Sequence, residues 1–330
     1  MKQESNYYIK GDFITRSHFQ QTLLKNNLTR YTAYFLYSLF AKILIFIKKL
    51  TSSPKRQYKY NVCVCALFKN EGKFLEEWIE YHLVVGVDCF YLYNNNSDDH
   101  YLDILDPYIK RGIVVLVDWP HDHAQMSAYK DCYTKFRDDT NWLLFIDLDE
   151  FVCPLNSDTI NSWLAPMKKY PGIAIYWKQF GSNGKLIHDP NQLVIEQYTQ
   201  CWEKPSVYTK MICNMDFPIY EFDNPHVICS TIFGFKIPPI NQFKKLVSFG
   251  INRGTNVNNP SIQINHYWGK AFDCFMESKV KRSDVYHKND KEMGQLRLML
   301  LDSHEAMCSV KEHKIHRFLL RTKLQINKEI

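Results

Sequence analysis

A strand-like run that ends in three carboxylates constrains this chain more than any other feature. Five apolar residues, Trp142 to Ile146, are followed by Asp147, Asp149 and Glu150. A short apolar run without alternation is typical of a central strand in a parallel sheet, which is buried on both faces. Ligands of open α/β sheets bind at the carboxyl ends of such strands. The run therefore predicts an α/β fold with a polar site at this end of the strand.

The spacing of the first two carboxylates indicates a metal site. In an extended segment Asp147 and Asp149 lie on the same face, while Leu148 points away. Two carboxylates this close repel each other unless a cation lies between them, and Mn²⁺ or Mg²⁺ completed by substrate phosphates suits the pair. Acidic residues that merely end a strand in solvent are the simpler alternative. Glu150-Phe151 argues against it, because a turn there would favour Gly, Asn or Pro.

Composition and charge narrow the class of protein. The 330 residues are 45% hydrophobic and 15% aromatic, enough for a folded enzyme-sized core. The net charge of +6 is spread along the chain, with no basic run suited to nucleic acid, so we expect no nucleic-acid partner. The ten cysteines form no C-x-x-C pair, which favours reduced, structural thiols and a cytoplasmic catalytic part.

Strand and helix signals alternate beyond residue 57, which is typical of βαβ units and a mostly parallel central sheet flanked by helices. We expect strands at Tyr60–Phe68, Cys89–Tyr93, Ile113–Val117 and Trp142–Ile146, and a helix at Gln125–Arg137. The carboxyl ends of these strands gather Lys69, Asn70, Glu71, Asn94, Asn95, Asp98, Asp147 and Asp149. A dinucleotide-binding fingerprint is absent, since only Lys-Asn-Glu-Gly follows the first strand, and no phosphate-binding P-loop is found. A sheet edge of this kind suits a nucleotide sugar.

One N-terminal segment raises the question of a membrane. Tyr31 to Ile47 holds a single charge, Lys42, and is flanked by Arg30 and by Lys48-Lys49. A helix that spans a bilayer needs about 20 apolar residues, so this segment is too short and too interrupted to cross with certainty. We expect a helix that lies in the membrane interface, with packing on the protein's own core as the alternative.

Several ordered motifs carry a family resemblance. The strings CALFKNEGKFLEEWIEYHLVVGVDCFYLYNNNSDD, AQMSAYKDCY and WLLFIDLDEF resemble glycosyltransferase family 92, the DUF23-type group, and related bacterial family-2-like transferases, which have a GT-A fold. The similarity covers Asn61 to Pro154 and continues more weakly to INHYWGKAFDCFMESKVKR at Ile264 to Arg282.

The resemblance implies a nucleoside-diphosphate sugar donor bound at the sheet edge. Asp147 and Asp149 would surround the divalent metal, and Asn94 lies in the loop that would touch base or ribose, where some relatives have Asp. The resemblance assigns to the same nucleotide-sugar site Lys69, Asn70, Glu71, Asn95, Asp98 and Gln125.

A second group of candidate site residues lies near the end of the region that resembles the family. His266 could be a third metal ligand, with an imidazole that suits manganese better than magnesium, although a lone histidine is more often structural. Lys270 follows it. Lys279 and Arg282 are three residues apart and share one side of a predicted helix, so they could meet the diphosphate or the acceptor.

The reaction itself demands a base for the acceptor hydroxyl. The resemblance suggests an inverting transfer, which needs a carboxylate or imidazole across the sugar ring from the leaving group. Glu196 is the first candidate, because it follows a loop expected to border the acceptor, and Asp223 is the second. An ordinary surface acid is the alternative for each of them.

The sequence therefore predicts a metal-dependent glycosyltransferase of GT-A type, with an N-terminal segment at residues 1–57, a catalytic domain at 58–288 and a helical extension at 289–330. The expected acceptor is a glycan or a lipid-linked glycan in cell-surface polysaccharide synthesis, with peripheral contact at the inner face of the cell membrane. Two alternatives stay open: a degenerate, membrane-associated protein that binds nucleotide sugars, and a metal-dependent nucleotidyl or phosphoryl transferase.

Overall fold

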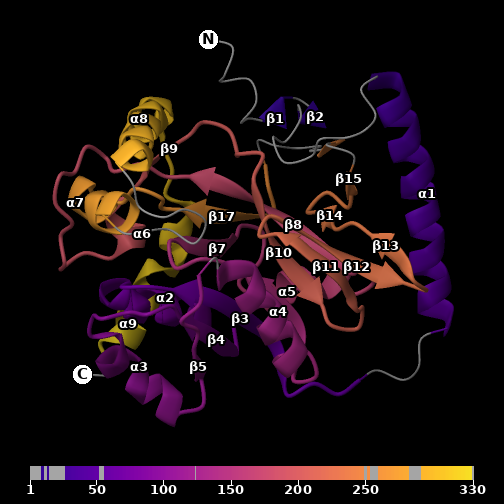
Figure 1. Ribbon diagram of the computed structural model, residues 1–330, viewed down its shortest axis with the longest axis horizontal. Helices are drawn as coiled ribbons and strands as arrows, with labels where there is room; N and C mark the ends of the chain where they lie inside the picture. The colour runs from indigo at the N-terminus through magenta and orange to yellow at the C-terminus, as the bar shows by residue number, and fades with distance from the viewer. Residues whose placement is uncertain are drawn as a thin grey trace.

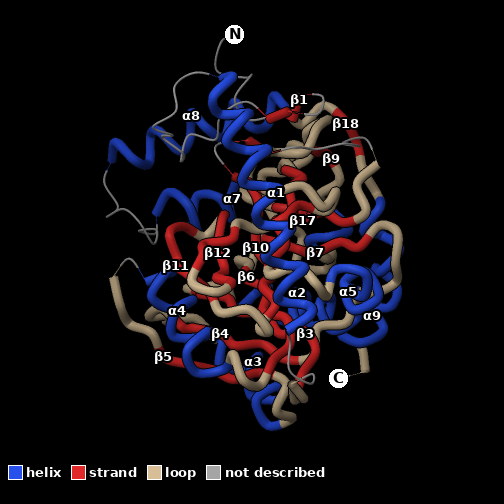
Figure 2. Tube along the Cα trace, turned by 90° about the vertical axis from the view of Figure 1, so that its right-hand side faces the viewer, coloured by secondary structure: helices blue, strands red, loops and turns tan. Residues whose placement is uncertain are grey.

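A nine-stranded mixed sheet runs through the middle of the molecule, with helices outside it (Figures 1 and 2). This computed structural model describes residues 9–10, 13–14, 27–51, 56–122, 124–248, 251–252, 259–281 and 291–328. Across the sheet the strands are β5 (Val114–Asp118), β4 (Cys89–Asn94), β3 (Tyr60–Phe68), β6 (Thr140–Phe145), β10 (Thr209–Asn214), β8 (Gly172–Gln179), β17 (Ile262–His266) and β7 (Glu150–Pro154), with β14 (Ile240–Asn241) paired to β8.

Five of the eight pairings in this sheet are parallel, which confirms the predicted α/β class. Strands β5, β4, β3 and β6 form a continuous parallel half, and their bounds agree with the predicted strands to within two residues. The other half is mixed, because β10 runs antiparallel to both β6 and β8. Four carboxyl ends therefore meet at one edge, as the sequence predicts.

The sheet is buried on both faces, which explains why its central strands are apolar without alternation. In β3, Val62, Val64 and Ala66 belong to one hydrophobic cluster, whereas Cys63 and Cys65 belong to the other. The first cluster includes helix α2 (Gly72–Val84), and the second includes helix α4 (Ala124–Phe136). All ten cysteines are buried and none is in a disulfide.

Shorter elements surround the sheet. The helical ones are α3 (Tyr101–Lys110), α5 (Ile160–Leu164), η2 (Ala165–Met167), α6 (Val194–Gln197), α7 (Phe272–Phe275), the π-helix η3 (Met276–Lys281), α8 (Lys291–Met307), η4 (Lys314–Phe318) and α9 (Leu319–Ile326). The strands are β11 (Ile219–Asn224), β12 (Val227–Ile232) and β13 (Phe235–Ile237) in a meander, and the pairs β1 (Ile9–Lys10) with β2 (Phe13–Ile14), β15 (Val247–Ser248) with β16 (Ile251–Asn252), and β9 (Gln200–Cys201) with β18 (Val310–Lys311).

The C-terminal part packs onto the helix and strands of the main body. The ring of Phe318, just before α9, lies 5.9 Å from the ring of Tyr81 in α2 in an edge-to-face contact. Strand β18 pairs with β9, which again joins the C-terminal part to the core. The division at residues 57 and 288 stays a prediction.

Helix α1 (Asn27–Thr51) contains the apolar N-terminal segment and lies along the outer side of the β11–β12–β13 meander (Figure 1). Tyr34, Ala41, Leu44 and Ile45 are buried against the body of the protein. Among the described helices, none has the length and hydropathy needed to cross a membrane.

The central strand β6 provides a test of how much the parallel half depends on packing. Leu144 is fully buried, so its replacement by alanine leaves a cavity, and we expect Leu144→Ala to lower the free energy of unfolding by about 2–5 kcal/mol. Leu102 of α3 is 52% exposed, so Leu102→Ala should change it by about 0.5 kcal/mol or less. Reversible chemical denaturation measures both. Equal effects of the two substitutions would contradict the fold.

Candidate active site

Loops from three neighbouring parallel strands bring the predicted nucleotide residues to one edge of the sheet. Asn70, after β3, adopts a left-handed backbone conformation with φ of 53°. Its side-chain oxygen accepts a hydrogen bond from the Asp98 N–H at 2.9 Å, and its own N–H donates to Ser97 Oγ at 3.0 Å. Asp99 Oδ2 accepts from the N–H of Gly72 at 2.7 Å, at the first residue of α2. The loops after β3 and β4 therefore hold each other in place.

The two predicted amides after β4 also organise this edge. Asn94 donates from Nδ2 to the Tyr101 hydroxyl at 2.9 Å and accepts from the Ser97 N–H at 3.0 Å. Asn95 donates from Nδ2 to the backbone oxygens of Trp119 and His121, at 2.8 and 2.9 Å. These contacts connect the loop after β4 to the chain that follows β5.

A cavity of 310 Å³ opens beside the loop after β3. One side is formed by Asn70, Glu71, Phe74 and Asp99, and the other by residues of α7 and η3, including Cys274 and Glu277. Glu71 is buried, Lys69 is half-buried and Asp98 is exposed. Of the residues predicted for these two loops, Asn70 and Glu71 line the cavity, and the others lie in the same loops outside its lining.

Asp147 is held by two side chains from different elements. Its Oδ1 accepts a hydrogen bond from Gln125 Nε2 of α4 at 2.7 Å. Its Oδ2 lies 2.7 Å from Lys210 Nζ of β10, and this lysine is 3.7 Å from Glu150 Oε1. Burial would lower the pKa of Lys210, but the carboxylates of Asp147 and Glu150 raise it above its ordinary value. Burial raises the pKa of Glu150 well above its ordinary value, although the charge of Lys210 opposes this shift. Lys210 is therefore a buried cation between the Asp147 carboxylate and the Glu150 carboxyl group.

Asp149 faces a second group of basic side chains. Its Oδ1 lies 3.6 Å from His266 Nε2 of β17, and its Oδ2 lies 2.8 Å from Lys279 Nζ of η3. Burial would raise the pKa of Asp149, but Lys279, His266 and Lys270 together hold it well below its ordinary value. Asp149 is consequently ionised although it is only 6% exposed.

The ring of His266 is fixed by its neighbours. Its Nδ1 lies 2.9 Å from the side-chain oxygen of Gln179. Burial lowers the pKa of His266, although the Asp149 carboxylate opposes this shift. Its Nε2 faces the Asp149 carboxylate, and Trp177 lies against the ring with the two ring centroids 4.2 Å apart. One ring nitrogen therefore faces Asp149 while the other contacts Gln179.

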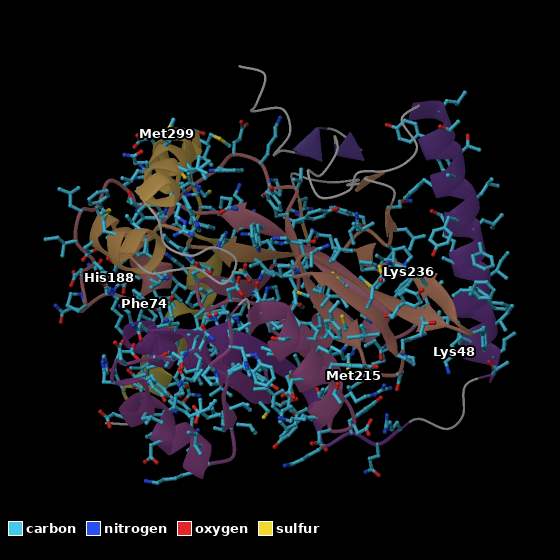
Figure 3. All side chains as sticks on the ribbon, viewed as in Figure 1. Lys48, Phe74, His188, Met215, Lys236 and Met299 are labelled. Atoms are coloured by element: carbon cyan, nitrogen blue, oxygen red, sulfur yellow. The ribbon has the colours of Figure 1, made fainter. Side chains whose placement is uncertain are left out.

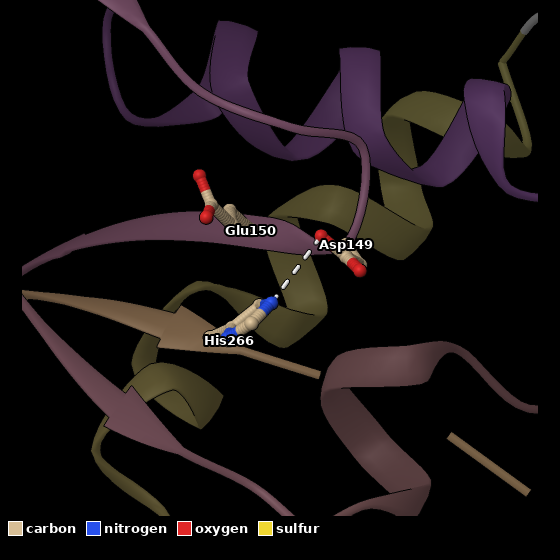
Figure 4. A group of neighbouring side chains, drawn as sticks. All are labelled: Asp149, Glu150 and His266. Atoms are coloured by element: carbon tan, nitrogen blue, oxygen red, sulfur yellow. Dashed lines mark ion pairs between the residues drawn. The ribbon is translucent and has the colours of Figure 1, made fainter. Parts of the chain in front are cut away.

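Asp149, Glu150 and His266 form a group that could hold a metal ion, with one ligand atom from each lying within 4.8 Å of the others. Figure 4 shows Asp149 and His266 directed toward each other, while the carboxylate of Glu150 is turned away from them. The 3.6 Å between Oδ1 and Nε2 is less than two metal–ligand bonds of about 2.1 Å, so one ion can touch both. The donor set therefore fits a divalent metal, and Gln179 supplies the outer hydrogen bond that metal-binding histidines usually have. Asp147 lies outside this group.

Two further basic residues, Lys270 and Arg282, were predicted for this site. Lys270 is buried, has a left-handed φ of 50° and places Nζ 4.4 Å from the centre of the Phe74 ring. Its charge also helps to lower the pKa of Asp149, so it lies on the same side of the site as Lys279. Arg282 is outside the described residues.

The two candidate bases are less clearly tied to this site. Glu196 of α6 forms an ion pair with Lys323 of α9, at 2.6 Å, at the junction with the C-terminal helix. Asp223 belongs to β11, but its side chain is outside the described part of the chain. Their role as bases stays a prediction.

The sequence analysis missed Lys210 and Gln179. A lysine in the apolar strand Thr209–Asn214 was the available signal for Lys210, because a buried cation needs a carboxylate partner. Gln179 ends β8, and nothing in its sequence neighbourhood marks it as the partner of His266.

Part of the chain is similar to known proteins. Residues 58–217 match the family described as Glycosyltransferase family 92. A glycosyltransferase family 92 protein of Oryza sativa subsp. japonica is 36% identical over 235 residues, which is 70% of this chain and 37% of that protein. A protein of Caenorhabditis elegans named beta-1,4-galactosyltransferase galt-1 is 28% identical over 127 residues, 33% of this chain and 28% of that protein. The chain spans about two fifths of the length of the first curated relatives it matches.

Among solved structures, S. aureus TarS 1–349 in complex with UDP-GlcNAc aligns with a TM-score of 0.35 and 13% identity, over 79% of this chain and 72% of that one.

The buried ion group around Lys210 can be tested by removing its cation. Lys210→Met leaves Asp147 and Glu150 without their counter-charge, so we expect a loss of about 3–5 kcal/mol in the free energy of unfolding. Adding Glu150→Gln should restore part of this loss, because an acidic group no longer faces Asp147 in the absence of the cation. Lys135→Met removes an exposed ion pair with Asp131 and should cost about 1 kcal/mol or less. Chemical denaturation gives all three values, and a Lys210→Met effect no larger than the Lys135→Met effect would contradict the assignment.

Proposed function

The chain belongs to glycosyltransferase family 92 through residues 58–217, and from this premise we propose that it transfers a sugar from a nucleoside-diphosphate sugar to a glycan or lipid-linked acceptor. The observation that carries the proposal is the ionised Asp149, which lies 3.6 Å from His266 Nε2 and 2.8 Å from Lys279 Nζ. The parallel strands whose carboxyl ends support this site are in keeping with the GT-A type that the resemblance implies.

The donor would lie along the carboxyl edge of the sheet. The loops after β3 and β4, with Asn70, Asn94 and Asn95, offer amides and backbone groups to the base and ribose. Lys69, Glu71 and Asp98 stay proposed contacts of the same nucleotide. The adjoining cavity of 310 Å³ provides room for part of the donor beside these loops.

The diphosphate would lie against the basic side of the site. Asp149 and His266 would hold a divalent ion, manganese or magnesium, which when bound neutralises charge on the diphosphate. Lys279 and Lys270 approach the same carboxylate and can stabilise the negative charge that grows on the leaving group. Gln125 and Lys210 fix the carboxylate of Asp147, which can then accept a hydrogen bond from the donor. We assign Arg282 the same charge-stabilising role.

The acceptor hydroxyl must lose a proton as the new bond forms. An inverting transfer places the base across the sugar from the diphosphate, and Glu196 and Asp223 remain our candidates in that order. Glu196 would have to exchange its ion pair with Lys323 for an acceptor contact. A shift of α6 relative to α9 would break this ion pair and free Glu196 for the acceptor hydroxyl. Acceptor binding would then be coupled to catalysis.

The family relation also suggests a donor sugar and a pathway for the product. The name of the Caenorhabditis elegans relative makes galactose the first sugar to test in the donor. We propose a role in cell-surface polysaccharide synthesis, with the enzyme in the cytoplasm and in contact with the inner face of the cell membrane.

The first test is a donor panel on the purified protein. UDP-galactose, UDP-glucose, UDP-GlcNAc, GDP-, CMP- and dTDP-sugars are compared by thermal shift and by donor hydrolysis, with and without Mn²⁺. We expect one donor class to raise the melting temperature and to be hydrolysed slowly in a metal-dependent way.

Asp149→Asn should abolish this response, because it removes the charge that holds both the ion and Lys279. Asp106→Asn removes an exposed partner of Lys110 in α3 and should leave the response unchanged. A well-folded protein that ignores every donor would contradict the proposed transferase. Glycosyl transfer to water releases a nucleoside diphosphate and the free sugar, whereas nucleotidyl transfer to water would release a nucleoside monophosphate and the sugar 1-phosphate.

Replacing Lys279 distinguishes the role of this lysine in charge stabilisation from the role of the metal ion. Lys279→Met should lower kcat with the preferred donor by about 10²–10³-fold, because a preorganised positive group near the leaving group is lost. The thermal shift caused by Mn²⁺ alone should persist or increase, since Lys279 no longer competes for Asp149.

Lys314→Met, which removes a peripheral ion pair with Glu312, is the matched control and should change neither quantity. An unchanged kcat in Lys279→Met would exclude this lysine from charge stabilisation.

A further inference from the structure

A cavity of 530 Å³ lies between the C-terminal end of α1 and the main body of the protein. Its lining includes Ile45, which is buried on the inner side of α1, and Phe217 and Pro218, which follow β10. Figure 3 labels two more residues of the lining, Lys48 on α1 and Met215 on the main body. The volume is in the range of pockets that bind small molecules.

This cavity lies at the edge of the sheet opposite the candidate active site. Tyr58 of the lining precedes β3, and Arg137 lies between α4 and β6. The end of β10 lies beside the start of β6, because the two strands are antiparallel, and the Met215 N–H donates to the Asn141 oxygen at 2.9 Å. These segments meet at the amino ends of β3 and β6, whereas Asp147 follows the carboxyl end of β6. The cavity is therefore separate from the residues proposed for sugar transfer.

The lining of the cavity is strongly basic. Asp216, an acid of the lining, already accepts a hydrogen bond from the Tyr58 hydroxyl at 2.9 Å. Six basic residues come from the end of α1, the segment before β3, the end of α4 and the turn before β8: Lys48, Lys49, Arg56, Arg137, Lys168 and Lys169.

These cations differ in how far acids already neutralise them. Arg56 and Arg137 both approach Asp138, at 2.6 and 3.6 Å. Lys168 and Lys169 are exposed, and neither forms an ion pair with any residue that the structure describes. The cavity therefore keeps a surplus of positive charge above a partly apolar lining.

We propose that this cavity binds a soluble ligand that carries two or more phosphate groups. Phosphate oxygens accept strong charge-assisted hydrogen bonds from lysine and arginine, and cations from four segments surround one volume here. Ile45 and Met215 offer apolar surface to an organic part of the ligand. The headgroups of a flat bilayer suit the cavity less well, because the buried Ile45 places it on the inner side of α1.

Occupation of the cavity joins α1 to the sheet. Lys48 and Lys49 belong to α1, whereas Lys168 and Lys169 precede β8, so one polyphosphate bridges the helix and the main body. A ligand that binds only the folded chain raises its melting temperature. This site is independent of the proposed transfer reaction, since it lies at the other edge of the sheet.

The test is calorimetric titration of the full chain with sodium tripolyphosphate and, separately, with orthophosphate. EDTA is present, so that no divalent ion carries the probe to Asp149, and the ionic strength is held constant within each series. We expect one tripolyphosphate to bind per chain, more tightly than orthophosphate, and the affinity to fall as the salt concentration rises.

Charge reversal in the cavity should remove this binding. Lys168→Glu combined with Lys169→Glu should weaken it by about tenfold or more, because two charge-assisted contacts are lost and two anions replace them. Lys244→Glu combined with Lys245→Glu is the matched control: these two lysines are also adjacent and exposed, and they are not part of the lining. This control has the same change of net charge and should bind as the wild type does. Unaltered melting temperatures without the probe show that both variants fold.

Three results would overturn the proposal. The first is the absence of tripolyphosphate binding, and the second is an equal loss in the Lys244→Glu, Lys245→Glu control. The third is a loss in Lys279→Met but none in the Lys168→Glu, Lys169→Glu variant, which would place the probe at the candidate active site. Donor hydrolysis should be unchanged in the cavity variant, so its measurement on the same preparations keeps a failure of this proposal separate from a failure of the transferase assignment.

Discussion

The arrangement of charged residues in this structure depends on the mutual repulsion of three acidic side chains within four residues. Asp147, Asp149 and Glu150 occupy the turn between β6 and β7, and Asp149 and Glu150 are almost fully buried. Ions brought together in a medium of low dielectric are tolerated only when opposite charges and hydrogen bonds compensate for the lost water. The elements that pack around this turn provide that compensation.

The compensating groups come from strands and helices far along the chain. Lys210, 63 residues after Asp147 in the sequence, reaches it from β10. Lys279 is 130 residues beyond Asp149 and contacts it from η3. His266 is fixed at the same carboxylate by the pairing of β17 with β7, in which His266 lies opposite Glu150. The mixed half of the sheet thus supplies Lys210 and His266, and the turn that follows β6 of the parallel half supplies Asp147 and Asp149.

This division explains how much could be predicted from the sequence. The parallel half was predictable because each of its strands is a short apolar run followed by polar residues, so the edge with Asn70, Asn94 and Asp147 follows from the order of elements alone. The sequences of strands β10, β8 and β17 contain no comparable apolar run followed by polar residues that would have predicted their positions in the sheet. Their register is set by long-range pairing, so the contact of Lys210 with Asp147 and that of Gln179 with His266 depend on geometry that no local pattern encodes.

The same limit applies to α1. Its composition predicted either an interfacial helix or a helix packed on the core, and no periodicity could choose, because the segment is apolar on nearly every side. The structure shows why the choice was open: Tyr34 and Leu44 are buried, whereas Leu36 and Phe46 on the opposite side are exposed. The buried side shows that α1 packs on the core, and the membrane contact of the exposed side stays a prediction.

The position of the family match adds a physical constraint on where the catalytic unit ends. Residues 58–217 contain all three carboxylates of the turn, and they also contain Gln125 and Lys210. His266, Lys270 and Lys279 lie beyond that stretch. A unit that stopped at residue 217 would keep the Lys210 ion group intact but would leave Asp149 buried without its neighbouring imidazole and ammonium groups. Because an uncompensated buried carboxylate is costly, the segment that supplies His266 and Lys279 has to fold together with the matched region. The acidic motif and the distal basic motif are therefore two halves of one site, and the second is as necessary for the stability of the first as it is for the chemistry that we propose.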